Sequence, residues 1–349
     1  MHERLLADFA AGKKAALARA ISVVENHRAG FEALLGMAHA RTGRAQRIGL
    51  TGPPGAGKST LTAGLCRAYR AEGLTVGIIA VDPTSPFTGG ALLGDRIRME
   101  DVALDPGVYI RSLATRGSLG GLSSATREIC DVLDAFGVDR ILIETVGVGQ
   151  TELDIARTAD SSVVVLVPES GDSIQTLKAG LMEIADIFIV NKSDRPGADR
   201  LRNEIEVMLG MRSGATLRDV PAHHGVDLSR NVARQAREAA SKDGDAWIPP
   251  VLRTVASKDE GVAGLVEALD RHFRYLEASG TLRDRRRTRL RERVVEVVED
   301  KARRRLWNDA GTRQWLEERL PELEAGRATP FTVADDLLAR SADLLTRTS

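Results

Sequence analysis

A glycine-rich stretch between an apolar run and a helix-like run constrains the fold of this chain more than any other feature. Residues 49–60 read GLTGPPGAGKST, and the part from Gly52 to Ser59 satisfies the pattern G-x-x-x-x-G-K-[ST]. Glycines let successive backbone N–H groups turn toward an anion, and the start of the following helix adds a positive partial charge. The stretch is therefore predicted to bind phosphate. Its predicted contacts are Gly52, Pro53, Pro54, Gly55, Ala56, Gly57, Lys58, Ser59 and Thr60.

Lys58 and Ser59 give this loop its chemistry. Lys58 can reach the β- and γ-phosphates of a nucleoside triphosphate, and the Ser59 hydroxyl can ligate Mg²⁺. The alternative is a tight strand–helix turn that matches the pattern by chance. The apolar run RIGLT before the loop and the helical run LTAGLCRAYRAEG after it supply the context that the phosphate loop requires, so we expect a nucleotide with magnesium.

Short apolar runs alternate with helix-like segments from Arg47 onward. Several runs are apolar almost throughout, as expected for strands that are covered on both faces of a parallel sheet. The predicted strands are residues 47–51, 75–82, 108–113, 140–146, 161–167, 186–192 and 249–256. The alternation predicts an α/β fold of the P-loop NTPase class, with a mostly parallel sheet and helices on both faces.

The chain is predicted to have three parts. Apolar residues at helical spacing indicate an N-terminal helical segment over residues 1–44. Residues 45–278 form the P-loop domain, which includes an irregular insertion at about 210–246. Residues 279–349 form a charged helical tail with an apolar stripe at three-to-four spacing.

Two features outside the central domain bear on partners. The tail carries Trp307 and Trp315, and large aromatic residues on a peripheral amphipathic segment indicate an interface. His223 and His224 in the insertion are adjacent, so on a helix or strand their side chains point apart, which favours exposed residues over metal ligands.

Composition narrows the setting. The 349 residues carry 49 basic and 49 acidic side chains, and this balance argues against nucleic-acid binding; the run RDRRRTRLRER is better explained as a solvated helix face. Cys66 and Cys130 form no CxxC pair, so neither a disulfide framework nor a zinc site is expected. With no apolar signal segment and no membrane-length stretch, we expect a soluble cytoplasmic protein without a membrane partner.

A second nucleotide signal is ILIETVGVGQT at residues 141–151. An apolar strand delivers Glu144, and in P-loop NTPases an acidic residue at such a strand end holds Mg²⁺. Gly147 follows, and its backbone N–H is expected near the γ-phosphate. The alternative for Glu144 is a carboxylate that caps the next helix.

A third signal concerns the base. The strand FIV ends in Asn191, Lys192, Ser193 and Asp194, the pattern N-K-x-D. A carboxylate at Asp194 can accept hydrogen bonds from N1–H and the exocyclic amine of guanine, which adenine does not present together, while Asn191 and the Lys192 stem brace the loop and cover the base. A polar strand exit alone would be unremarkable, but here it follows a phosphate loop and a Glu-x-x-Gly stretch.

The loop RTVASKDEG at 253–261 lies where GTPases place a backbone N–H that faces guanine O6. Ala256 is the expected donor, flanked by Val255 and Ser257, although Val255 replaces the usual small polar residue.

Two further carboxylates, Asp82 and Asp95, flank a loop rich in Gly, Ser and Thr at 81–99. This loop suits a segment that orders in one nucleotide state and loosens in another. An Asp-Pro turn followed by a helix cap fits these residues equally well.

These motifs together resemble one known family. GPPGAGKST, VDPTSPFTGGALLGDRIRM, ETVGVGQ and ESGDSIQTLKAGLMEIADIFIVNKSD are similar to stretches of the methylmalonyl-CoA mutase-associated GTPases of the MeaB/ArgK type, over about residues 45–300. The resemblance implies a GTPase chaperone that gates cofactor loading and protects or reactivates an adenosylcobalamin-dependent acyl-CoA mutase. It implies homodimerisation through the tail, and no cobalamin held tightly on this chain.

The resemblance also implies residue roles. It places Ser59, Asp82, Asp95 and Glu144 around Mg²⁺, and it makes ESGDSIQTLKAG a switch that touches the partner. Gln175 and Lys178 are the expected contacts of that switch, and the alternative is an ordinary helix start.

Catalysis is expected to rest on Lys58, Mg²⁺ held through Asp82 and Glu144, and backbone donors such as Gly147. Val148 stands where Ras-like enzymes place the glutamine that orients water, and Gln150 is nearby but displaced, so slow turnover that a partner stimulates is predicted.

Three rival functions are open to a chain with these motifs: a nickel-type metal-insertion GTPase, an ATP-dependent amino-acid-transport kinase, and a GTP-binding scaffold that does not hydrolyse GTP. The first lacks the expected Cys/His motifs, and Asp194 favours guanine over adenine.

Overall fold

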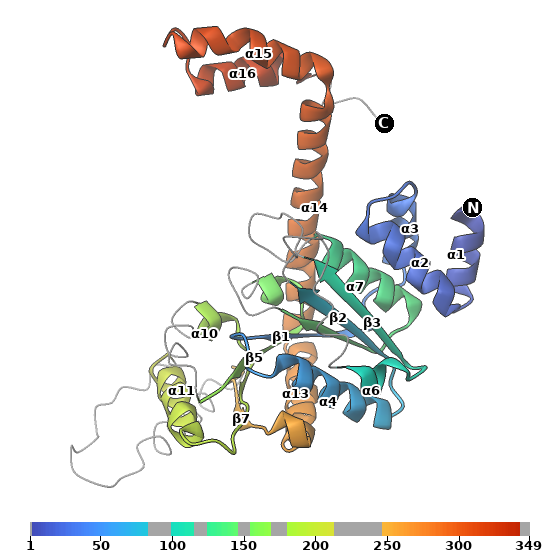
Figure 1. Cartoon of the computed structure of the whole chain (residues 1–349), viewed down its shortest axis with the longest axis vertical. Coiled ribbons are helices and arrows are strands. Elements are labelled where there is room, and N and C mark those ends of the chain that lie inside the picture. The colour runs from blue at the N-terminus through green and yellow to red at the C-terminus, as the bar shows by residue number, and fades with distance from the viewer. Residues whose placement is uncertain are drawn as a thin grey trace, which may run out of the picture. The chain divides into compact units, whose positions relative to one another are not determined.

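The inner strands of the central sheet are almost entirely buried. The computed structural model describes residues 2–82, 99–114, 124–145, 154–168, 180–212 and 246–342. Within them, seven strands pair in parallel in the order β3-β2-β4-β1-β5-β6-β7 (Figure 1). They are β1 Gln46–Thr51, β2 Val76–Asp82, β3 Val108–Ala114, β4 Arg140–Glu144, β5 Ser161–Leu166, β6 Ile187–Val190 and β7 Val251–Arg253. The predicted α/β class is confirmed.

The last strand is shorter than its predicted range of 249–256. Pro249 and Pro250 have no backbone N–H for a ladder, although the Pro250 carbonyl accepts from Phe188 at 2.9 Å. After Arg253 the chain leaves the sheet and forms a closed loop, in which the Val255 N–H donates to the Glu260 carbonyl at 3.0 Å. This loop, residues 254–261, is called the base loop below.

Helices cover both faces of the sheet. Helices α4 (Lys58–Ala71) and α13 (Val262–Ala278) pack on one face, while α7 (Ser124–Phe136) packs on the other. The remaining segments of this part are α6 Glu100–Ala103, η1 Ile155–Arg157, α10 Met182–Ile184, α11 Ala198–Arg212 and η3 Ala256–Lys258. None of the helices in the described ranges is long and apolar enough to cross a membrane.

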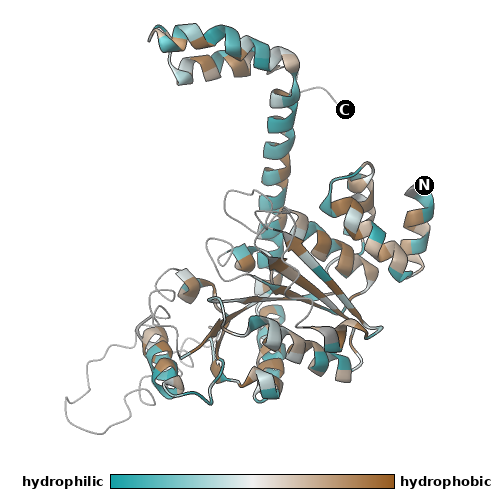
Figure 2. Cartoon of the chain, viewed as in Figure 1, coloured by the Kyte–Doolittle hydropathy of each residue, from teal (hydrophilic) through white to brown (hydrophobic). Residues whose placement is uncertain are grey.

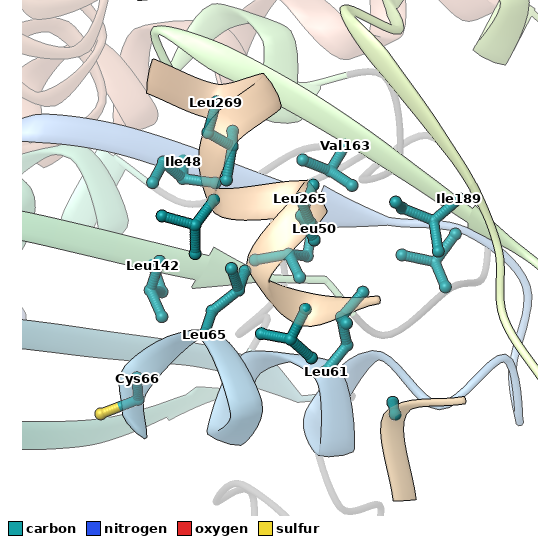
Figure 3. Packing of buried hydrophobic residues seen from close by; sticks show 14 of the residues in the cluster. Ile48, Leu50, Leu61, Leu65, Cys66, Leu142, Val163, Ile189, Leu265 and Leu269 are labelled. Atoms are coloured by element: carbon teal, nitrogen blue, oxygen red, sulfur yellow. The ribbon is translucent and has the colours of Figure 1, made fainter. Parts of the chain in front are cut away.

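One hydrophobic cluster joins α4 and α13 to the sheet. Leu61 and Leu65 of α4 meet Leu265 of α13 over the middle strands (Figure 3). Figure 2 shows the middle strands largely in brown, the colour of hydrophobic residues, whereas the surrounding helices carry both brown and teal residues. Because α4 starts at the phosphate loop and contributes Leu61 and Leu65 to this cluster, the packing fixes the helix that follows the loop.

The N-terminal helical segment is confirmed as three helices: α1 His2–Ala10, α2 Lys14–Glu25 and α3 Phe31–His39. Their apolar residues join α7 in a second cluster on the other face of the sheet. Polar contacts add to this packing, since His27 Nε2 lies 3.0 Å from Glu128 Oε2, and buried Asp134 accepts the backbone N–H groups of the 43–45 link.

The chain divides into two units, Met1–Leu282 and Arg283–Ser349. The C-terminal helical region consists of α14 (Thr281–Asn308), α15 (Ala310–Glu324) and α16 (Pro330–Arg340). Asp309 caps α15 by accepting from the Thr312 N–H at 2.7 Å, and Thr329 with Thr332 forms a capping box on α16. These caps set the sharp ends that separate the three helices.

Candidate nucleotide-binding site

The predicted nucleotide residues gather at the carboxyl edge of the sheet. In a parallel sheet all carboxyl ends share one edge, and β1 lies between β4 and β5 in the strand order. The phosphate loop after β1, Glu144 at the end of β4 and Asn191 after β6 therefore meet there.

Glycines of the phosphate loop allow close approaches that a side chain would block. Gly52 has φ 134°, and a Cβ placed on it would lie 2.1 Å from the Val165 carbonyl oxygen of β5. Gly57 has φ 85°, and its Cβ would lie 2.4 Å from Asn191 Nδ2. The loop thus packs closely against β5 on one side and against the strand exit at Asn191 on the other.

Lys58 is folded back over the loop that precedes it. Its ammonium donates to the carbonyl oxygens of Gly52 at 2.9 Å and Pro53 at 3.0 Å, and the residue is buried. The charge therefore already sits inside the loop, where the phosphates of a nucleotide are predicted to bind.

Ser59 and Glu144 form the predicted magnesium end of the site. The Ser59 hydroxyl donates to Glu144 Oε1 at 2.6 Å, and both side chains are buried. A hydroxyl and a carboxylate are the hard oxygen donors that Mg²⁺ prefers, so this pair fits the ion. The side chain of Asp82 and the whole of Asp95 lie outside the described residues, within which no group of three or more His, Cys, Asp or Glu gathers as a metal cluster.

Thr145 ties the end of β4 to the end of β1. Its N–H donates to the Leu50 carbonyl at 3.1 Å, and its hydroxyl donates to Thr51 Oγ1 at 3.0 Å. The position of Glu144 relative to the phosphate loop is therefore held by a buried backbone and side-chain pair.

Asn191 is the hub of the base-binding end. Its Nδ2 donates to the Ala56 carbonyl at 2.8 Å, while its Oδ1 accepts from the Thr254 hydroxyl at 3.0 Å and the Ala256 N–H at 3.1 Å. One buried amide thus joins the phosphate loop, β6 and the base loop.

The other base residues are arranged around this hub. Lys192 is half-buried with φ 53°, and Asp194 is exposed, as a carboxylate that receives an incoming base must be. The Ala256 N–H, predicted to face guanine, donates to Asn191 in this structure. Val255 is buried and Ser257 is exposed.

Thr254 is a site residue that no motif marks in the sequence. It is a single threonine after a short strand, and its hydroxyl is buried beside Asn191. Thr254 follows Arg253 at the strand exit, and no pattern in the sequence distinguishes it as a contact of Asn191.

Several predicted residues lie outside the described part of the chain. They are Asp95, Gly147, Gln150, Gln175, Lys178, His223 and His224.

Comparison with known proteins agrees with this geometry. The sequence profile of methylmalonyl Co-A mutase-associated GTPase MeaB matches residues 17–311. The chain is 49% identical over 287 residues to a putative GTPase of Pyrococcus horikoshii, covering 82% of each chain. It is 32% identical to the GTPase ArgK of Escherichia coli, covering 92% of this chain and 91% of that one.

A solved structure gives the same result for the fold. The crystal structure of a LAO/AO transport system kinase superposes with a TM-score of 0.63 at 26% identity, covering 96% of this chain and 95% of the other. The chain therefore belongs to the family of methylmalonyl Co-A mutase-associated GTPases, MeaB, and is a GTPase.

Proposed function

We propose that this GTPase is a chaperone that gates adenosylcobalamin loading and protects or reactivates an adenosylcobalamin-dependent acyl-CoA mutase, methylmalonyl-CoA mutase first. The observation that carries the proposal is the family match over 17–311, because the family is described by its association with that mutase. A phosphate loop hydrogen-bonded through Asn191 to a base loop supports the guanine nucleotide as its energy source.

The described residues would divide the work of nucleotide binding. Lys58 exchanges its two carbonyl partners for β- and γ-phosphate oxygens, and Asp194 accepts from the edge of guanine. Ser59 and Glu144 would hold Mg²⁺, which when bound neutralises charge on the phosphates. Asp82, Asp95, Gly147 and Gln150 complete the proposed site from the sequence.

Turnover is proposed to be slow until the mutase binds. Val148 occupies the position of the water-orienting glutamine of Ras-like enzymes, so positioning of the attacking water must come from elsewhere. We assign that task to switch segments that the mutase orders, with Gln175 and Lys178 as the contacts of the switch with the mutase.

The C-terminal helices are proposed to form a homodimer interface. Apolar side chains at helical spacing along α14 are exposed, with Leu290 at 53%, Val294 at 63% and Val298 at 60%. A contiguous apolar stripe of this kind is typical of a surface that another protein covers. Sedimentation of a chain truncated after Ala278 tests this, since a truncated chain that remains dimeric contradicts the assignment.

Purified protein and purified methylmalonyl-CoA mutase test the main proposal. We expect GTP turnover well below the median enzyme rate of about 10 s⁻¹ for the chain alone, and stimulation of tenfold or more by the mutase. Turnover at ordinary enzyme rates without a partner, or no stimulation by methylmalonyl-, isobutyryl- or ethylmalonyl-CoA mutases, would contradict it. An unrelated acyl-CoA enzyme without cobalamin is the control.

The kinase named for the similar solved structure suggests an ATP-dependent rival. Measuring the affinities for GTP and ATP under the same conditions distinguishes this rival from the proposed GTPase. Binding of ATP as tight as that of GTP would contradict the role proposed for Asp194.

A further inference from the structure

Gly64 is an unexpected residue for its place in the fold. It lies in the second turn of α4, the helix that begins at the phosphate loop, and it is buried. Glycine destabilises a helix interior relative to alanine, so a glycine here needs a local reason. The helix is regular at this point, and Gly64 is absent from the residues with positive φ, so backbone freedom does not supply that reason.

The reason is the close approach of the base loop. A Cβ on Gly64 would lie 3.0 Å from Asp259 Oδ1 and 3.2 Å from Val262 Cγ2. Both distances are tighter than ordinary van der Waals contact, so the missing side chain makes room for the end of the base loop against α4.

Arg67, three residues further along the same helix, forms an ion pair with the Asp259 carboxylate, for which Gly64 leaves room. Its Nη2 lies 2.5 Å from Asp259 Oδ1. Residues three apart lie on one face of a helix. The Asp259 carboxylate therefore lies against Gly64 and pairs with the Arg67 guanidinium at the same time.

The backbone of the base loop connects Asp259 to the residues proposed to bind the base. Asp259 adopts a left-handed conformation with φ 57°, and its N–H donates to the Ala256 carbonyl at 3.3 Å. Ala256 in turn donates to Asn191. Only a few residues of one short loop therefore separate the Arg67 contact from the group that faces the base.

We infer that Gly64 and Arg67 are positioning residues for guanine: they hold the base loop on the phosphate-loop helix and thereby set the affinity for the nucleotide base. The inference rests on the proposed assignment of Asn191, Asp194 and Ala256 to guanine. One rigid helix then fixes the spacing between the phosphates and the base, since Lys58 and Gly64 lie about 9 Å apart along its axis.

The variant Gly64→Ala separates this role from a merely structural one. Alanine raises helix propensity while its Cβ crowds Val262, and because these two effects oppose each other the melting temperature should change little. The added Cβ displaces the Asp259 carboxylate, so binding of GDP should weaken about two- to five-fold, the range of an exposed ion pair. Gly264→Ala in α13 is the matched control, because a Cβ on Gly264 has no atom within 4 Å.

Arg67→Gln and Asp259→Asn test the ion pair directly, and asparagine tolerates the left-handed backbone. Each should weaken GDP binding by the same factor as the double variant, because both remove one contact. Binding of tripolyphosphate with Mg²⁺, which has no base, should not change. Arg200→Gln, which removes the exposed pair with Glu204 on α11, is the control.

The outcomes are distinguishable. If Gly64→Ala and Arg67→Gln bind GDP as tightly as their controls, or lose tripolyphosphate binding equally, the inference is wrong while the proposed function stands. If the unaltered protein does not prefer GDP over ADP, the proposed guanine assignment fails, and the inference fails with it.

Discussion

The side-chain amide of Asn191 lies 2.8 Å from the backbone oxygen of Ala56, so the strand exit predicted to read the base is hydrogen-bonded to the loop predicted to hold the phosphates. The same amide accepts two donors of the base loop through its other atom. A single side chain therefore connects the phosphate loop to the base loop.

Replacing Asn191 with alanine should damage both stability and binding. It leaves the Ala56 carbonyl, the Thr254 hydroxyl and the Ala256 N–H without this partner, and each unsatisfied buried group costs about 1–3 kcal/mol. We expect the free energy of unfolding to fall by about 2–4 kcal/mol and GDP binding to weaken at least tenfold. Urea unfolding and titration calorimetry measure the two effects. Asn203→Ala on the exposed face of α11 is the control, and a variant with unchanged GDP affinity would show that Asn191 is not the hub.

Thr254 should matter through its hydroxyl rather than its shape. Thr254→Val keeps the volume but removes the donor to Asn191 Oδ1, while the Ala256 N–H still binds that atom. The expected loss of GDP affinity is about three- to tenfold, corresponding to about 1 kcal/mol for one buried hydrogen bond. Thr254→Ser restores the hydroxyl and should restore the affinity; failure of this rescue would assign the effect to packing instead.

The sheet explains why three of the motifs predicted for the site lie together. The phosphate loop, Glu144 and Asn191 each follow an apolar strand, and parallel strands bring their carboxyl ends to one edge, so three separated motifs had to meet. Contacts made across loops were not predictable in this way. Thr254 depends on how the chain turns after β7, and the role of Gly64 depends on which segment packs against the second turn of α4. A single residue whose role depends on a tertiary contact leaves neither a periodic pattern nor a motif in the sequence.

Asp194→Asn should change which base is bound. The carboxylate accepts from N1–H and the exocyclic amine of guanine, whereas an amide in the same place can donate to the oxygen that xanthine carries instead of the amine. We expect GDP affinity to fall at least tenfold and XDP affinity to rise, measured by competition against a fluorescent nucleotide. Asp101→Asn, an exposed carboxylate on α6, is the control. Equal losses for both nucleotides would mean that Asp194 does not contact the base edge.

The Cys66 thiol should be unreactive in the folded protein. Burial raises the pKa of this thiol to about 12 from 9.0, with Asp105 adding to the rise. A thiol reagent at pH 8 should therefore leave it unmodified until guanidinium unfolds the chain.

The same pKa shift makes a pH prediction. The folded-state pKa lies above the unfolded value, so the stabilisation is complete below about pH 9 and is lost as the pH rises toward 12. The melting temperature should thus fall more steeply between pH 8.5 and 10.5 in the unaltered protein than in Cys66→Ala. Parallel slopes would contradict the shift.

Ser59→Ala and Glu144→Gln should separate the metal from the nucleotide. The hydroxyl and the carboxylate lie 2.6 Å apart, and neither residue is proposed to contact the base, so their loss should leave recognition of guanine largely intact. Because both are proposed ligands of Mg²⁺, we expect GTP turnover to fall at least tenfold and the magnesium concentration for half-maximal activity to rise. Removing the ion with EDTA should abolish the difference between the variants and the unaltered protein, since all then lack the ion.

Ser22→Ala on α2, far along the chain from the phosphate loop, is the control. If the variants instead kept the magnesium response and lost GDP binding in the presence of EDTA, the pair would be serving the architecture of the phosphate loop and not the metal.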